Sequence, residues 1–124
     1  MSDILLTEDP DNYSAVGAGD SVFGLGGDDV LTATDGGNRL YGGNGSDTLN
    51  GGQGNDVLKG DDDNNFDGLN ILNGAGGDDV IESNSNRDEI DAGAGDDTVE
   101  MSDVGVDQVV NGGAGFDDLV LTAF

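Results

Sequence analysis

The sequence of 124 residues contains no cysteine, no histidine and no tryptophan. The lack of cysteine excludes disulfides, and the lack of both cysteine and histidine excludes a zinc site of the usual kind, a histidine-based triad and a thiolate nucleophile. No apolar run approaches the ~18 residues of a membrane helix. The first ten residues, MSDILLTEDP, lack the basic start and apolar stretch of a signal peptide. Carboxylates remain as the reactive groups, and export would need another route.

Basic residues are also scarce, since three of them stand against 27 acidic residues and give a formal net charge of −24. Such a chain repels polyanions, so nucleic acid and acidic membrane surfaces are poor partners. High acidity with few aromatic residues is typical of disorder. The acidic residues are regularly spaced, however, and the length fits one ordered domain.

Glycine is abundant, with 24 residues, and it recurs in a pattern of nine places. Residues 42–50 read GGNGSDTLN and residues 51–59 read GGQGNDVLK. The eighth place is apolar in Val22, Leu31, Leu40, Leu49, Leu58, Leu72, Ile81, Ile90, Val99, Val110 and Leu119. The spacing is nine except for fourteen after Leu58 and eleven after Val99. The sixth place, two residues earlier, is almost always aspartate or asparagine.

This pattern resembles the RTX (repeats-in-toxin) nonapeptide G-G-x-G-x-D-x-U-x of proteins exported by bacterial type I secretion. The resemblance covers residues 15–120 and implies an all-β fold, a parallel β-roll (right-handed β-solenoid) of about five coils with calcium-binding turns on both edges. Residues 1–14 are interpreted as an N-terminal cap, and residues 121–124 as a C-terminal cap or the start of a truncated segment. In the family an uncleaved export signal often follows the repeats. Here the repeats run almost to Phe124, so we expect either a module of a larger protein or a very short signal.

Each repeat has a part for a strand and a part for a turn. The last three places are long enough only for a short strand, whose middle residue faces inward. In the six-residue turn, glycine permits positive φ and close approach of carbonyls to an ion, and aspartate supplies the hard oxygen that calcium prefers. The predicted metal residues are Asp20, Asp29, Asn38, Asp47, Asp56, Asp79, Asp88, Asp97 and Asp117, with Gly26, Gly27, Gly36, Gly43, Gly45, Gly52, Gly54, Gly76, Gly77, Gly93, Gly95, Gly113 and Gly115.

Two repeats should make one coil, so alternate turns stack on opposite edges. The resemblance implies about 4–8 calcium ions, each held between a turn and the turn one coil later by sixth-place carboxylates and turn carbonyls. One edge should stack Asp20, Asn38, Asp56, Asp79, Asp97 and Asp117, and the other Asp29, Asp47, Asn70, Asp88 and Asp107. The best sites are expected at Asp29/Asp47, Asp79/Asp97 and Asp97/Asp117, while the uncharged Asn38 weakens its pairs.

Three segments depart from the pattern. Residues 83–91, SNSNRDEID, have no glycine, and residues 101–111, MSDVGVDQVVN, have one, so neither is typical of a calcium turn. The acidic insert at residues 61–68, DDDNNFDG, matches half of a D-x-[DN]-x-[DN]-G calcium loop but has Gly74 where the bidentate acid belongs. A solvated loop that bulges from one turn is the favoured interpretation over an extra calcium site.

Other features of the sequence indicate packing or structure rather than a binding or catalytic site. Phe23, Tyr41 and Lys59 lie eighteen residues apart and should stack on one outer face, as cross-strand packing rather than a ligand patch. Acid pairs such as Asp28–Asp29 could suggest glycosidase carboxylates, but their repetition indicates a structural role, and no enzyme is predicted. The outward positions form no threonine row of the ice-binding kind.

The predicted function is a calcium-binding module whose folding is triggered by millimolar extracellular calcium. It would be unfolded in the cytoplasm, then secreted, and would serve secretion and the extracellular folding or stabilisation of covalently linked domains. The alternative is an adhesin module that binds a ligand or surface through an outer face or the insert. We expect calcium and linked domains as partners, no nucleic acid and no membrane insertion. A monomer is expected, although open strand edges allow end-to-end association.

Overall fold

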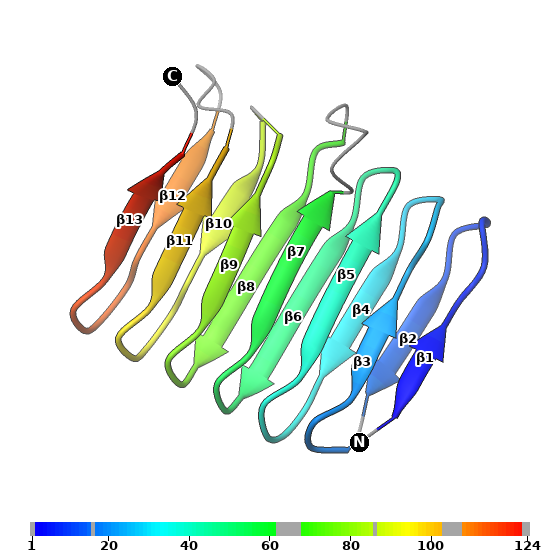
Figure 1. Ribbon diagram of the computed structural model, residues 1–124, viewed down its shortest axis with the longest axis horizontal. Coiled ribbons are helices and arrows are strands. Elements are labelled where there is room, and N and C mark those ends of the chain that lie inside the picture. The colour runs from blue at the N-terminus through cyan, green and yellow to red at the C-terminus, as the bar shows by residue number, and fades with distance from the viewer. Residues whose placement is uncertain (1, 16, 62–67, 86, 103–107, 123–124) are drawn as a thin grey trace.

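The computed structural model describes residues 2–15, 17–61, 68–85, 87–102 and 108–122, which hold thirteen strands and no helix (Figure 1). The strands are β1 (Asp3–Leu5), β2 (Asn12–Ala15), β3 (Ser21–Phe23), β4 (Val30–Ala33), β5 (Arg39–Gly43), β6 (Thr48–Gln53), β7 (Val57–Asp61), β8 (Ile71–Gly76), β9 (Val80–Ser83), β10 (Glu89–Asp91), β11 (Thr98–Met101), β12 (Val109–Asn111) and β13 (Asp118–Leu121). Accordingly, none of the residues described here belongs to a helix long and apolar enough to cross a membrane.

The strands form two parallel sheets that face each other, as Figure 1 shows. The odd-numbered strands β1 to β13 make a seven-stranded sheet in chain order, and the even-numbered strands β2 to β12 make a six-stranded sheet. Each strand pairs with the strand one coil later, for example Leu40 with Leu58 and Leu49 with Leu72. With two strands in each coil, the thirteen strands make about six coils. The predicted parallel β-roll is confirmed.

The solenoid begins earlier in the chain than residue 15. β1 pairs with β3 and places Ile4 beside Val22, and β2 pairs with β4 and places Tyr13 beside Leu31. Ile4, Tyr13 and Val22 continue the nine-residue spacing, although no glycine turn precedes Ile4 or Tyr13. Residues 1–14, predicted as a cap, therefore contain the first coil, and their capping role remains a prediction.

The core is a double row of aliphatic side chains between the sheets. Every eighth-place residue from Val22 to Val99 is at most 2% exposed: Val22, Leu31, Leu40, Leu49, Leu58, Leu72, Ile81, Ile90 and Val99. Leu58 and Leu72 both lie in this core, so the five extra residues between them do not shift the later register. The core opens at the C-terminal coil, where Val110 is 37% and Leu119 is 55% exposed.

The outer face of the seven-stranded sheet carries the predicted aromatic row. The rings of Phe23 and Tyr41 stack with centroids 4.8 Å apart and planes 7° apart. Lys59 is the register neighbour of Tyr41, and its Nζ lies 3.9 Å from Glu82 Oε2. These side chains shield the sheet, in agreement with the interpretation as cross-strand packing.

Candidate calcium sites

The turns fall on two edges of the solenoid. We call the turns before odd-numbered strands, at residues 15–20, 33–38, 51–56, 74–79, 92–97 and 112–117, the regular edge. We call the turns before even-numbered strands, at residues 24–29, 42–47, 60–70, 83–88 and 101–108, the irregular edge. Both length departures and the repeat without glycine fall on the irregular edge, at the top of Figure 1. Residues 62–67 of the insert and Asp107 lie outside the described residues.

Successive turns on one edge approach each other at backbone distance, which explains the glycines. Gly45, at the fourth place, has φ 127°, a conformation that residues with a side chain rarely adopt. A Cβ at Gly54, also at the fourth place, would lie 2.5 Å from the carbonyl carbon of Gly36 in the turn one coil earlier. Eleven of the thirteen predicted glycines have positive φ: Gly27, Gly36, Gly43, Gly45, Gly52, Gly54, Gly77, Gly93, Gly95, Gly113 and Gly115. The other two, Gly26 and Gly76, occupy the third place and form isolated bridges to the next turn.

The sixth-place side chains form a hydrogen-bonded ladder along each edge. The Oδ1 atom of Asp47 accepts the backbone N–H of Asp29 at 2.8 Å, and Oδ1 of Asp97 accepts that of Asp79 at 2.8 Å. The ladder joins Ser2, Asp20, Asn38, Asp56, Asp79, Asp97 and Asp117 on the regular edge. On the irregular edge it joins Asp11, Asp29, Asp47, Asn70 and Asp88. The described residues predicted to share an edge are thus brought together.

The second carboxylate oxygen has no partner in five of these aspartates. The Oδ2 atoms are buried and accept no hydrogen bond in Asp29, Asp47, Asp56, Asp79 and Asp97. Each of these residues is only 1% exposed. A buried anionic oxygen without a partner is strongly unfavourable. These five atoms therefore require a positive ligand or a proton.

A backbone carbonyl lies beside this oxygen in four of the five aspartates, Asp29, Asp47, Asp56 and Asp79. A Cβ built on Gly51, at the first place, would lie 2.8 Å from Asp56 Oδ2 and 2.7 Å from the carbonyl oxygen of Gly74 one coil later. The same pair of oxygens meets at Gly24, Gly42 and Gly74. The carboxylate and the carbonyl are hard oxygens of the kind that calcium binds. The sequence analysis missed these first-place glycines, although they are the first letter of the repeat.

Burial controls the protonation of these carboxylates. Desolvation raises the pKa of Asp47 to about 7 and the pKa of Asp56 to about 6. It also raises the pKa of Asp29, Asp79 and Asp97, and neighbouring carboxylates add to the increase in all five. The hydrogen bond from the preceding coil lowers each pKa but does not offset the desolvation. A bound cation would remove both the desolvation cost and the repulsion between neighbouring carboxylates.

The fifth place forms a second ladder, which the sequence analysis did not predict. Oδ1 of Asp78 accepts the backbone N–H of Asp96 at 2.9 Å, and Oδ1 of Asp96 accepts that of Phe116 at 3.0 Å. Asp28 and Asn55 accept in the same way from Ser46 and Asp78. A fifth-place side chain accepts from the backbone of the next coil, whereas a sixth-place side chain accepts from the backbone of the previous coil. The acid pairs at the fifth and sixth places are therefore parts of two opposed ladders, as their repetition indicated.

Backbone carbonyls would have to supply most ligands of an ion. Among the residues for which positions are described, no three Asp or Glu side chains converge as a metal cluster. Calcium takes six to eight oxygens. The turn geometry fits this requirement because carbonyls of consecutive turns are packed against the buried carboxylates.

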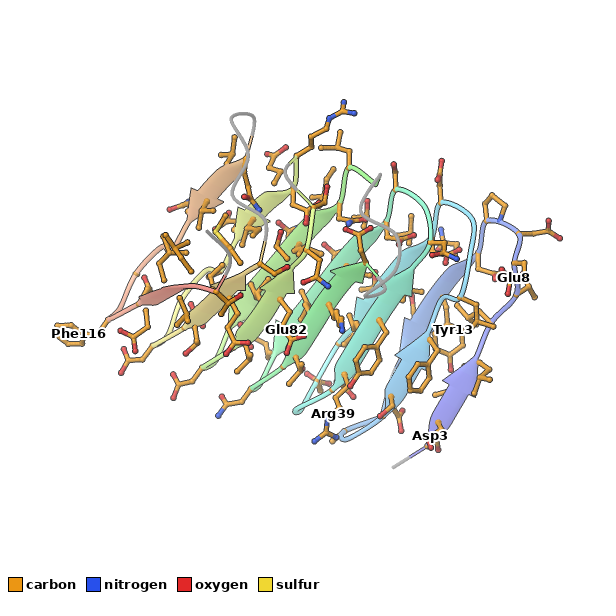
Figure 2. All side chains as sticks on the ribbon, turned by 45° about the horizontal axis from the view of Figure 1, so that its top comes forward. Asp3, Glu8, Tyr13, Arg39, Glu82 and Phe116 are labelled. Atoms are coloured by element: carbon orange, nitrogen blue, oxygen red, sulfur yellow. The ribbon has the colours of Figure 1, made fainter. Side chains whose placement is uncertain are left out.

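Four predicted sixth-place residues differ from the five aspartates with an unpartnered Oδ2, namely Asp20, Asn38, Asp88 and Asp117. Asn38 has Nδ2 in place of an anionic oxygen, and this amide donates to the carbonyls of Asp35 and Gly36, each at 3.1 Å. Asp20 is half-buried and Asp117 is exposed, because they lie near the two ends of the ladder. Next to Asp117, Phe116 projects into solvent with 88% exposure (Figure 2).

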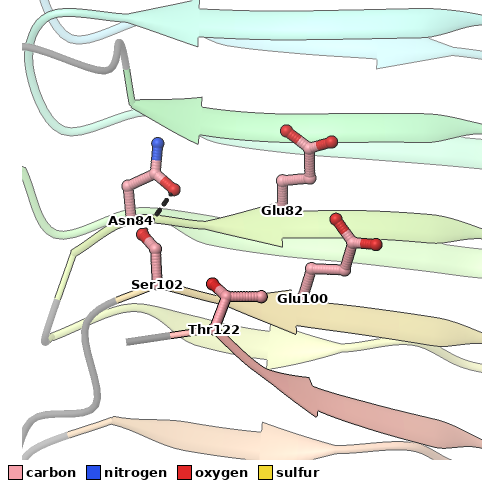
Figure 3. A pocket seen from close by; sticks show the side chains of 5 residues that line it. All are labelled: Glu82, Asn84, Glu100, Ser102 and Thr122. Atoms are coloured by element: carbon pink, nitrogen blue, oxygen red, sulfur yellow. Dashed lines mark hydrogen bonds between the residues drawn. The ribbon is translucent and has the colours of Figure 1, made fainter. Parts of the chain in front are cut away.

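A shallow hollow lies on the outer face of the seven-stranded sheet, beside the irregular edge. Figure 3 shows its lining by Glu82, Asn84, Glu100, Ser102 and Thr122. Glu82 and Glu100 are register neighbours on β9 and β11. Ser102 Oγ donates to Asn84 Oδ1 at 2.7 Å. The two carboxylates are exposed to solvent in part, so this hollow lacks the buried, unpartnered oxygens of the turns.

Comparison with known families agrees with this geometry. The chain matches the family of RTX calcium-binding nonapeptide repeats, described as four copies, over residues 14–48, 32–67 and 65–99. These ranges together span residues 14–99, which is more than half of the chain. The chain therefore belongs to the RTX calcium-binding nonapeptide repeat family and is a calcium-binding β-roll module. No curated protein and no solved structure matches it.

Proposed function

We propose that calcium binds in the turns and that the chain folds when it does so. The observation that carries this proposal is the set of five buried Oδ2 atoms without a hydrogen-bond partner, in Asp29, Asp47, Asp56, Asp79 and Asp97. Uncompensated burial of five carboxylates opposes folding of the metal-free chain. Calcium that binds only the folded turns stabilises the folded state by about 2.7 kcal/mol per site when free calcium is ~100-fold above the dissociation constant.

The residues proposed to hold the ions lie on both edges. On the regular edge they are the pairs Asp56/Asp79, Asp79/Asp97 and Asp97/Asp117, and on the irregular edge the pair Asp29/Asp47. The first-place carbonyls of the following coil, such as those of Gly42 and Gly74, would complete the ligand set. The ion supplies positive charge at this position, and the chain's own residues supply a rigid stack of oxygens. The glycines keep that stack close enough to share ions between coils.

The proposed biological role follows from calcium-dependent folding. The chain would remain unfolded in the low calcium of the cytoplasm, leave the cell unfolded, and fold outside, where it stabilises or spaces linked domains. Support comes from the net charge of −24, which opposes compaction until cations bind. The repeated use of acidic residues in ladders supports a structural rather than an enzymatic role.

Circular dichroism during a calcium titration tests the proposal. We expect a disordered spectrum in chelator and a cooperative gain of β signal at roughly 0.1–1 mM calcium, the range of extracellular modules. Magnesium serves as the control ion and should substitute poorly, because it demands octahedral geometry and releases water reluctantly. A cooperatively melting β spectrum that is identical in excess chelator would contradict the proposal.

A further inference from the structure

The turn at residues 83–88 differs from the proposed calcium turns in the hydrogen-bond partners of its buried carboxylate, Asp88. Its first place holds Ser83 instead of glycine, and the Ser83 hydroxyl donates a hydrogen bond to Asp88 Oδ2. Asp88 Oδ1 accepts the backbone N–H of Asn70 at 3.0 Å. Both carboxylate oxygens of Asp88 therefore have partners, although the residue is fully buried. This turn lacks the unpartnered oxygen that marks the proposed calcium turns.

Asp88 also accepts more hydrogen bonds than the buried aspartates of the proposed calcium turns. Burial raises the pKa of its carboxyl, while hydrogen bonds from the Ser83 hydroxyl, the backbone and side chain of Asn70 and the backbone of Ser85 lower it. In Asp47 and Asp79, by contrast, a single backbone hydrogen bond opposes the burial. The protein itself thus supplies to Asp88 the compensation that the other aspartates lack.

A buried network connects this turn to its two neighbours on the irregular edge. Gln108 Nε2 donates to Ser83 Oγ at 2.7 Å and to the Ser85 carbonyl at 3.1 Å. On the other side, Ser85 Oγ donates to the Gly68 carbonyl at 2.7 Å. Ser83 and Ser85 are fully buried. The network thus spans three consecutive turns through hydrogen bonds alone.

The charges of the neighbouring coils agree with this arrangement. The sixth-place residues before and after Asp88 are Asn70 and Gln108, which are both uncharged. Among the residues that the structure describes, no sixth-place carboxylate therefore faces Asp88 across a coil, so repulsion from these two positions does not call for a cation. Gln108 Oε1 is buried without a partner among the described residues, but one neutral oxygen is far from the six to eight that calcium takes.

We propose that Ser83, Ser85, Asp88 and Gln108 form a calcium-free turn, in which hydrogen bonds replace the ion that the repeat would otherwise bind. Asp88, predicted from the sequence as a calcium ligand, is then a structural hydrogen-bond acceptor. The inference rests on the proposed function, since it divides the turns into those that take calcium and those that do not. It removes the turn of Asp88 from the proposed calcium sites of the irregular edge.

Matched substitutions on the same edge test the inference. Bound calcium is counted by isothermal titration calorimetry on the full chain for Asp88→Asn and Asp47→Asn. We expect Asp47→Asn to lose at least one ion, because it removes an unpartnered carboxylate oxygen. Asp88→Asn should keep the wild-type count, because its amide can still engage Ser83 and Asn70 is unchanged. Loss of an ion in Asp88→Asn would overturn the inference.

A second variant, Ser83→Ala, tests the hydrogen bond to Asp88 through the midpoint of calcium-induced folding. Ser83→Ala removes the hydroxyl and leaves Asp88 Oδ2 without that donor, so the midpoint of calcium-induced folding should rise by about twofold with the ion count unchanged. Ser14→Ala, at an exposed position of β2, is the control and should leave the midpoint unchanged. An unchanged midpoint in Ser83→Ala would overturn the inference. If the wild-type chain binds no calcium at all, the proposed function itself fails, which is a distinguishable result.

Discussion

At the sixth places of the described turns, buried carboxylate oxygens without a hydrogen-bond partner follow one another on the regular edge in Asp56, Asp79 and Asp97, whereas on the irregular edge they occur in Asp29 and Asp47. Beyond Asp47 the irregular edge uses side-chain hydrogen bonds, such as those of Ser83 with Asp88 and of Asn70 Nδ2 with Asp61 Oδ2 at 2.8 Å. The strands on the two sides share one core and one register. The comparison shows that the turns, and not the strands, decide where charge must be neutralised.

The separation of the turns into two edges also explains why extra residues are tolerated on one of them. The described turns pack against the turns above and below them on the same edge, at distances that exclude a Cβ at Gly45 or Gly54. Five extra residues before Asn70 and two before Gln108 therefore disturb one edge alone. The other edge keeps six-residue turns throughout. The edge that is free of insertions is also the edge on which carboxylates stack without interruption from Asp56 to Asp117.

The largest effect is expected from a side chain in a calcium turn. Gly45→Val would force a β-branched residue into φ 127° and against the Gly27 carbonyl, at a cost of several kcal/mol from strain and lost coordination. Calcium-dependent folding should be lost or shifted to far higher calcium in circular dichroism. Asn50→Thr, on the adjoining strand, should cost no more than about 1 kcal/mol, the value of its hydrogen bond from Asn73 Nδ2. Equal effects of the two substitutions would contradict the turn assignment.

The next largest effect should separate the two edges. Asp79 has carboxylates one coil away on both sides, Asp56 and Asp97, whereas Asp47 has Asp29 on one side and Asn70 on the other. Asp79→Asn should therefore raise the calcium midpoint several-fold and by more than Asp47→Asn, because it weakens two charged pairs instead of one. Calcium titrations followed by circular dichroism give both midpoints. A larger shift for Asp47→Asn would show that the irregular edge binds calcium more tightly.

A smaller effect is expected from pH in calcium-depleted buffer. The folded-state pKa of Asp47 is about 7 and that of Asp56 about 6, both above the unfolded value of 3.8. Between these values the folded state binds more protons than the unfolded state, so the contribution of these two carboxyls to stability is greatest below pH 4 and is lost as the pH rises toward 7. The β signal should increase on acidification from pH 8 to pH 4, with sedimentation as the control for aggregation. A β signal that is independent of pH would contradict the burial of these carboxylates.

The smallest effect is expected from shortening the insert. The sequence analysis favoured a solvated loop at residues 61–68, but Asp61 is buried and accepts a hydrogen bond from Asn70, so Asp61 belongs to the framework. Removal of residues 62–66 keeps Asp61 and Gly68 and restores the nine-residue spacing. The calcium midpoint should then change by less than about twofold, because the register of β8 is set by its pairing with β6. Loss of folding would show that the insert is part of the framework.

Most of the fold could be predicted from the sequence, because the nine-residue period is local information. The period predicted that Leu49 and Leu58 face inward and that the same register continues after the insert. The coil at Ile4 and Tyr13 was missed because its turns lack glycine, although its spacing was present. For the candidate sites, the sixth-place residues and their stacking followed from the period. The roles of the first-place glycines and of the fifth-place ladder did not follow from it, because the period does not show which carbonyl or backbone N–H of the next coil meets them.

By itself the sequence determined the period, the inward residues and the two edges, since strand alternation and glycine turns leave one arrangement for a repeat of nine. It also determined that any ion must be a hard cation, because carboxylates and carbonyls are the available ligands. Only the tertiary structure decided which carboxylates need that ion. The Oδ2 atom of Asp47 has no partner and that of Asp88 has Ser83, and this difference depends on the residue at the first place and on side chains one coil away. The need for a cation is a property of burial and partners, which arise only when coils stack.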